Sequence, residues 1–166
     1  MLWSNVSHDS QLLTAHARTS ALLVRLLLAH TEAAVTESYT VFYSGDAEKI
    51  SPHSKGLLTY ELGKEGDTGS LALRLTANGE GGLFSREWIT LDAIHAILEQ
   101  QQDSFPSRVF RPLFGQGSTN NTGFLAAVLR TPDICLIEAD SSRLFMHRCY
   151  TDWQHRMTRL AALSQD

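Results

Sequence analysis

The stretch that decides the fold is residues 71–91, which read LALRLTANGEGGLFSREWITL. Its first half alternates leucine with smaller or polar residues, which is the period of a strand with one buried face. Asn78-Gly79 is a strong signal for a tight turn between antiparallel strands, and the two following glycines prolong it. Apolar and polar residues alternate again over residues 83–89. The stretch therefore predicts an antiparallel hairpin whose return strand carries Arg86.

The chain on either side of this hairpin predicts a mixture of helices and strands. Apolar residues at helical spacing predict helices over residues 10–37, over 91–98 with a start at Thr90 or Asp92, and over 151–163. Composition rich in β-branched and aromatic residues predicts strands at 39–43 and 57–62. A second hairpin is expected around Asp140, with strands at 134–137 and 144–150. Residues 45–56 and 115–123 are expected to be loops, and residues 124–129 fit either a strand or a short helix.

Length and composition favour one globular domain, and the predicted mixture of helices and strands makes its class α+β. The chain has 166 residues, of which 43% are hydrophobic and 19% are charged, and this balance suits a packed core. We expect one domain over residues 1–166 with flexible ends at 1–9 and 164–166. Its centre would be a mainly antiparallel sheet of at least five strands, with helices packed on one face. The formal charge of −4 offers no excess of cations for phosphate groups, so nucleic acid is not an expected partner.

The sequence shows no targeting signal, which predicts a cytoplasmic protein. The longest apolar run, residues 21–29, is interrupted by Arg25 and is far shorter than the roughly 20 residues of a membrane span. The N-terminus has no basic region followed by an apolar stretch and a cleavage site. Cys135 and Cys149 are the two cysteines, and so small a number fits a reduced compartment better than a disulfide scaffold.

Sequence motifs for metals and cofactors do not occur, so we expect neither. The seven histidines lack ligand spacing, and His147 with Cys149 has no second cluster that would complete a metal site. The glycines of residues 79–82 lie between two predicted strands, whereas a phosphate loop must lead into a helix N-terminus. Neither cysteine lies in a recognisable nucleophile motif, so a structural role is expected for both.

Arg86 is the candidate binding residue that the pattern singles out. It is expected in mid-strand, on the face that it shares with Phe84 and Trp88. A guanidinium among apolar neighbours must reach solvent or pair with an anion, because its unpaired burial is costly. Two interpretations stay open: a solvent-facing arginine paired with Glu87 or Glu80, and a binding site for an anionic ligand.

Several segments resemble the chorismate pyruvate-lyase family, whose fold is shared with the effector-binding domains of UTRA type in bacterial transcription regulators. Residues 75–86 are similar to the family's strand, acidic-glycine turn and second strand ending in an arginine. Residues 22–35, with the triplet Leu26-Leu27-Leu28, are similar to its early helix. Arg111-Pro112-Leu113-Phe114 resembles its arginine-x-leucine-phenylalanine segment. The resemblance runs from about residue 22 to residue 150.

The resemblance implies a chorismate-lyase-like fold and a ligand site that works without a cofactor. The family's enzymes convert chorismate to 4-hydroxybenzoate and pyruvate. By the resemblance, Arg86 falls on the family's ligand-binding arginine, where a planar guanidinium suits a carboxylate bidentately. Leu125 and Arg148 are the further ligand-binding residues that it implies, and Arg86 and His147 are the catalytic ones.

The chain departs from the family where a glutamate is expected in the last main strand. That position falls on His147 or Arg148, and strand alternation puts these two side chains on opposite faces, so only one faces a pocket. Histidine could transfer a proton near neutral pH, whereas arginine could hold a second carboxylate without moving a proton. Glu138, in the facing strand of the second hairpin, is a third candidate.

Three functions are therefore open at the level of sequence. The first is a lyase-like protein that binds, and converts, chorismate or a related aromatic precursor. The second is a non-catalytic module for a small anionic ligand, and the third is a protein-interaction domain that uses Trp3, Trp88 or Trp153. The missing glutamate leaves open whether the chain is an enzyme. For the first two functions, the expected partner is a small anionic or aromatic carboxylic acid; its identity and the oligomeric state are not specified.

Overall fold

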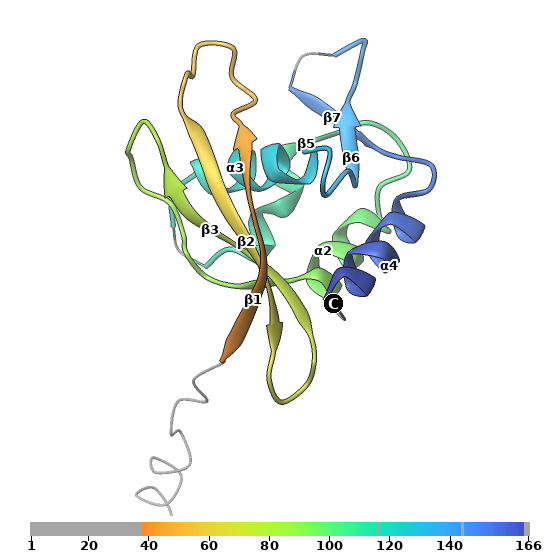
Figure 1. Cartoon of the computed structure of the whole chain (residues 1–166). Coiled ribbons are helices and arrows are strands. Elements are labelled where there is room, and N and C mark those ends of the chain that lie inside the picture. Colours follow the sequence, from red (N-terminus) through yellow and green to blue (C-terminus); the bar gives the residue numbers. More distant parts are fainter. Residues whose placement is uncertain (1–37, 116, 144, 165–166) are drawn as a thin grey trace, which may run out of the picture. The chain divides into compact units, whose positions relative to one another are not determined.

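The fold is given by a computed structural model of the chain, which describes residues 38–115, 117–143 and 145–164 (Figure 1). These residues lie in one unit that starts at Ser38. They form two antiparallel sheets and four helical segments, which confirms the predicted α+β class. The helix expected over residues 10–37, and most of the expected flexible ends, lie outside the described residues.

The larger sheet has the strand order β1-β2-β3-β4, and the smaller one has the order β5-β7-β6. Every neighbouring pair is antiparallel. The single sheet of five or more strands is thus a wrong prediction for the described part of the chain, because helices occupy most of the sequence between the two sheets. The strands are β1 (Tyr39–Glu48), β2 (Leu57–Glu65), β3 (Leu71–Asn78), β4 (Ile89–Thr90), β5 (Phe105–Pro106), β6 (Ile137–Ala139) and β7 (Met146–Cys149).

The helices cover the buried face of the larger sheet. Helix α3 packs against β1 and β2, and α2 packs against β3. Leu58, Tyr60 and Leu62 alternate with more exposed residues along β2 and are fully buried in the shared core. The helical segments are α2 (Leu91–Leu98), the 3-10 helix η1 (Ser107–Leu113), α3 (Asn120–Leu129) and α4 (Trp153–Leu163). Among the helices that the structure describes, none is long and apolar enough to cross a membrane.

The prediction of a return strand after Asn78 is wrong for most of the residues it covered. Strand β3 pairs along nearly its whole length with β2, and only Ile89–Thr90 pairs with it on the other side. The chain leaves the sheet because Gly81 and Gly82 have φ angles of +74° and +95°, a conformation that glycine adopts without strain. The Asn78 side chain also donates a hydrogen bond to the Gly81 carbonyl. Arg86 therefore lies in an irregular, exposed segment and not in mid-strand.

Two predicted loops are shorter than expected. Strand β1 extends through Gly45 to Glu48; a Cβ atom at Gly45 would come within 2.8 Å of Tyr60 Oη, so this glycine permits close packing and does not mark a turn. Helix α3 begins at Asn120, inside the loop predicted over residues 115–123. It resolves the ambiguity of residues 124–129 as helix. Because residues 125–129 are all buried, no amphipathic period was available to reveal it.

The remaining predicted elements are confirmed except the strand expected at 134–137: β6 begins at Ile137 and runs to Ala139, so the two overlap at one residue. Thr90 caps α2, since its Oγ1 accepts a hydrogen bond from Ala93 N at 3.2 Å. Strands β6 and β7 form the second hairpin around Asp140. Helix α4 buries Trp153 in the core, so this tryptophan is not the exposed contact that an interaction domain would use. Trp88 stacks on Tyr39, with ring centroids 4.5 Å apart.

Candidate functional site

The four residues that the sequence suggested for a site occupy different environments. Arg86 is exposed, and its guanidinium lies 5.3 Å from the ring centroid of Phe84. Leu125 is buried within α3. His147 and Arg148 lie on opposite sides of β7, as alternation predicted: His147 is completely buried and the Arg148 side chain is mostly exposed. Within the described residues, His147 therefore faces the core while Arg148 and Arg86 face solvent.

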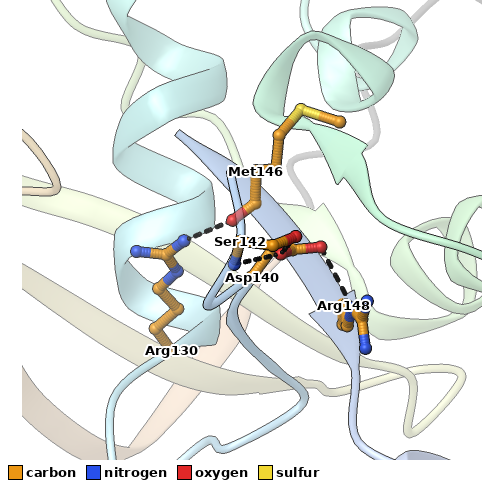
Figure 2. A network of polar contacts seen from close by, with 5 residues as sticks. All are labelled: Arg130, Asp140, Ser142, Met146 and Arg148. Carbon is orange, nitrogen blue, oxygen red and sulfur yellow. Dashed lines mark hydrogen bonds and ion pairs between the residues drawn. The ribbon is translucent and has the colours of Figure 1, made fainter. Parts of the chain in front are cut away.

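Arg148, in strand β7, is paired with an acidic side chain from the β6–β7 turn (Figure 2). Asp140 accepts hydrogen bonds from Ser142 N at 2.7 Å, Ser142 Oγ at 2.6 Å and Arg148 Nε at 3.0 Å. These bonds, those of Ser142 first, hold the pKa of Asp140 well below its usual range. Arg130 Nη2 donates to the Met146 carbonyl at 2.9 Å in the same region. The network ties the hairpin together and leaves Arg148 paired with Asp140.

His147 is a neutral histidine of the core. Its Nε2 lies 2.7 Å from Ser107 Oγ, and its Nδ1 has no hydrogen-bond partner among the described residues. Burial, aided by the positive charge of Arg130, lowers the pKa of His147 to about 4. The imidazole is therefore uncharged at pH 7, and it is removed from the near-neutral range that would suit a proton carrier.

A cavity of about 480 Å³ lies beside the first turn of α3, and its size suits a small-molecule ligand. Its walls come from the loop after β1, the turn after β3, the start of η1, α3 and the β6–β7 turn. None of the four sequence candidates is among its lining residues. The lining consists of Lys49, Ile50, Ser51, Ser54, Asn78, Glu80, Gly81, Ser107, Thr119, Asn120, Thr122, Gly123, Phe124 and Phe145.

An ion pair between a largely buried lysine side chain and an exposed glutamate forms part of the cavity wall. The Lys49 side chain is only 8% exposed, and its Nζ lies 2.6 Å from Glu80 Oε2 and 5.7 Å from the ring centroid of Phe124. Glu80 also accepts a hydrogen bond from Lys55 N at 3.0 Å. The Lys49 hydrogen bond, and next that of Lys55 N, lower the pKa of Glu80 to about 2. Glu80 is thus ionised at pH 7, and its carboxylate pairs with the Lys49 side chain in the wall.

The first turn of α3 supplies the remaining electrostatic feature. Thr119, the residue before the helix, makes no capping hydrogen bond with its side chain, and the first turn contains no acidic residue. Asn120 N and Asn121 N already donate to Ser118 Oγ and Ser118 O, both at 3.2 Å, so this helix N-terminus attracts an anion chiefly through its partial positive charge. Across the cavity lining, Asn78 Oδ1 is a buried acceptor without a partner in the described residues, and it can accept a hydrogen bond from a hydroxyl.

No known family model, curated protein or solved structure matches this chain. The proposal for its function therefore depends on the cavity itself. The described residues also contain no group of three or more potential metal ligands.

The cavity was not predicted from the sequence, because its walls come from separate loops. Lys49 and Glu80 are 31 residues apart in sequence, and Ser107 is nearly as far beyond Glu80. The one local signal was the glycine-rich turn after Asn78, which indicated a turn but not what the turn faces. Pairing across such distances is set by the tertiary fold and leaves no spacing pattern.

Proposed function

We propose that this chain is a non-catalytic binding module for a small aromatic carboxylic acid. The observation that supports this most is the cavity of about 480 Å³, in which Phe124 and Phe145 share the lining with the first turn of α3. Aromatic walls with a few polar groups are typical of small-ligand sites. A ligand with an apolar ring and one anionic end uses both kinds of wall.

The ligand is best oriented with its carboxylate at the first turn of α3. There the helix N-terminus favours negative charge, and Thr119, Asn120 and Thr122 contribute polar side chains to the lining. Its ring then contacts Phe124 and Phe145. A hydroxyl on the ring can donate to the exposed Glu80 carboxylate in the same lining.

The resemblance to the chorismate pyruvate-lyase family agrees with this ligand class, since 4-hydroxybenzoate is such an acid. Binding without turnover is favoured over a lyase because the lining offers no side chain suited to proton transfer near pH 7. His147 is buried and neutral, and Glu80 remains ionised because its pKa is lowered to about 2. Arg86 lies on an exposed segment outside the lining.

Titration calorimetry with 4-hydroxybenzoate tests the proposal. We expect the native chain to bind with a Kd between about 10 µM and 1 mM, given the ligand's size. Phe124→Leu should weaken binding by about tenfold, because it removes an aromatic wall. Glu80→Gln should strengthen binding, because it removes a negative charge from the wall and frees Lys49 to attract the acid.

Arg159→Ala serves as the control, because Arg159 is exposed on α4 and is not part of the cavity lining. It should bind as the native chain does. The proposal is rejected if the native chain binds neither 4-hydroxybenzoate nor benzoate. It is also rejected if Phe124→Leu and Glu80→Gln both bind with the same affinity as the native chain. Incubation with chorismate should release no pyruvate above the uncatalysed background; turnover would instead support the lyase.

A further inference from the structure

We propose that Ser107 is a ligand-binding donor of this cavity and that His147 is the residue that positions its hydroxyl. This inference rests on the proposed function and extends it to a residue that neither the motifs nor the resemblance singled out. Ser107 lines the cavity, whereas His147 lies behind it in the core. The pair therefore connects the packed interior with the ligand site.

Strand pairing fixes the two residues relative to each other. Ser107 begins η1 directly after β5, and β5 pairs with β7 through Phe105 with His147 and Pro106 with Met146. The Phe105 and His147 rings lie 5.8 Å apart, so the imidazole is confined by packing as well as by its backbone. The resulting distance from Ser107 Oγ to His147 Nε2 is 2.7 Å.

The direction of this hydrogen bond follows from the unpaired nitrogen of the ring. A neutral imidazole carries one proton, on Nδ1 or on Nε2. His147 Nδ1 is buried without a partner, and a buried N–H left unpaired costs more than a buried lone pair left unpaired. The proton therefore belongs on Nε2, which donates to Ser107 Oγ.

A serine that accepts this bond has its own proton free to donate elsewhere. Ser107 is partly exposed and lines the cavity, so its O–H can donate to an acceptor oxygen of the ligand. The carboxylate is the strongest acceptor in the proposed ligand, and hydrogen bonds to charged groups are worth more than those to neutral ones. Ser107 and the first turn of α3 would then bind the same carboxylate.

The opposite direction would make Ser107 a nucleophile, with its proton donated to His147 Nε2. Nucleophilic pairs of this kind normally hold the second ring nitrogen with an orienting group. His147 Nδ1 has no such partner among the described residues, and the low pKa of its ring makes it a weak base. The geometry thus favours a binding serine over a catalytic one.

Calorimetry with 4-hydroxybenzoate tests the role of the pair. Ser107→Ala should lower affinity by about tenfold, the effect of one lost charged hydrogen bond. Ser141→Ala, at an exposed serine outside the cavity lining, should stay within about twofold of the native chain. His147→Phe should lower the affinity as much as Ser107→Ala does. The double variant that carries both changes should bind with the same affinity as Ser107→Ala alone. His147→Gln can still donate to Ser107 and should retain binding.

Thermal unfolding confirms that each variant is folded before it is titrated. If Ser107→Ala binds normally while Phe124→Leu and Glu80→Gln still change affinity, this inference fails and the proposed function stands. If the native chain binds no acid, both fail. Nitrogen-15 NMR of His147 needs no ligand and should place the ring proton on Nε2. A proton on Nδ1, or covalent labelling of Ser107 by a fluorophosphonate, would overturn the inference.

Discussion

The turn after β3 and the turn between β6 and β7 both carry a side chain that folds back on its own backbone, but they differ in how fully their polar groups are paired. In the β6–β7 turn, Asp140 accepts three hydrogen bonds, two from Ser142 and one from Arg148 (Figure 2). In the turn after β3, the Asn78 side chain donates to Gly81, while its Oδ1 has no partner in the described part of the chain.

The carboxylates of the two turns are both paired, but they differ in exposure. The Asp140 side chain is 1% exposed, and that of Glu80 is 40% exposed at the cavity that contains Lys49. A buried carboxylate that is fully paired stabilises one conformation, whereas a carboxylate exposed at a cavity can interact with a ligand. The β6–β7 turn therefore stabilises the fold, and the turn after β3 forms part of the wall of the proposed site.

The largest effect should come from breaking the paired turn. Asp140→Ala removes three hydrogen bonds from a side chain that has almost no contact with water, and we expect the midpoint of thermal unfolding to fall on the order of 10 °C. Lys49→Met is the matched change at the cavity. It replaces a buried ammonium by an apolar chain of similar length and should leave the midpoint within about 3 °C or raise it.

Circular dichroism melts of the two variants measure this contrast. Glu80 stays able to pair with Lys55 N in Lys49→Met, so no buried charge is left without a donor. A larger loss in Lys49→Met than in Asp140→Ala would show that the cavity wall, and not the β6–β7 turn, supports the fold.

The next effect concerns His147, the buried histidine of β7 that lies beside Ser107 of the cavity lining. Folding lowers the pKa of His147 from 6.5 to about 4. Between these two pH values, the histidine binds a proton more readily in the unfolded chain than in the native one. The neutral, buried histidine therefore contributes its full stabilisation of the native state above pH 6.5, and this stabilisation is lost as the pH falls toward 4. From pH 7 to pH 5, this residue alone should lower the free energy of unfolding by about 2 kcal/mol.

Urea unfolding of the native chain and of His147→Phe at both pH values isolates this contribution. The phenylalanine variant fills similar space and cannot titrate, so its stability should fall by about 2 kcal/mol less over the same interval. Equal pH dependence in the two proteins would mean that the ring is not held neutral by burial.

The same contrast explains which parts of the fold the sequence could reveal. The β6–β7 hairpin and α4 were predicted because their signals are local: Asp140 with two serines marks a turn, and Trp153 with Leu160 lies on one helical face. The turn at Asn78 was also predicted, but the strand that pairs with β3 was not. Strand β3 pairs with β2, across a turn at residues 66–70, and no local rule ranks two neighbouring strands as partners.

The candidate site was harder to predict than the fold. His147 was selected for its chemistry, yet its position on β7 puts it in the core, where burial removes that chemistry. Lys49, Glu80 and Ser107 carry no motif, and only the tertiary fold brings them to one cavity. Polar residues from separate loops form a site only when the tertiary fold brings them together. Their spacing in the sequence does not predict this.

The smallest effect should be that of Arg86→Ala, and it separates the cavity from the family resemblance. If residues 75–86 bind a ligand as the resemblance implies, removing the guanidinium should weaken 4-hydroxybenzoate binding by about 1.5–3 kcal/mol. The structure gives Arg86 a different setting: it is exposed, lies over Phe84 and is absent from the cavity lining. We therefore expect affinity within about twofold of the native chain and stability within about 0.5 kcal/mol. Calorimetry and urea unfolding measure both quantities on the same preparation. A tenfold loss of affinity in a folded Arg86→Ala protein would move the carboxylate from the first turn of α3 to the segment after Gly82, and would make the family's arginine clamp the better description of the site.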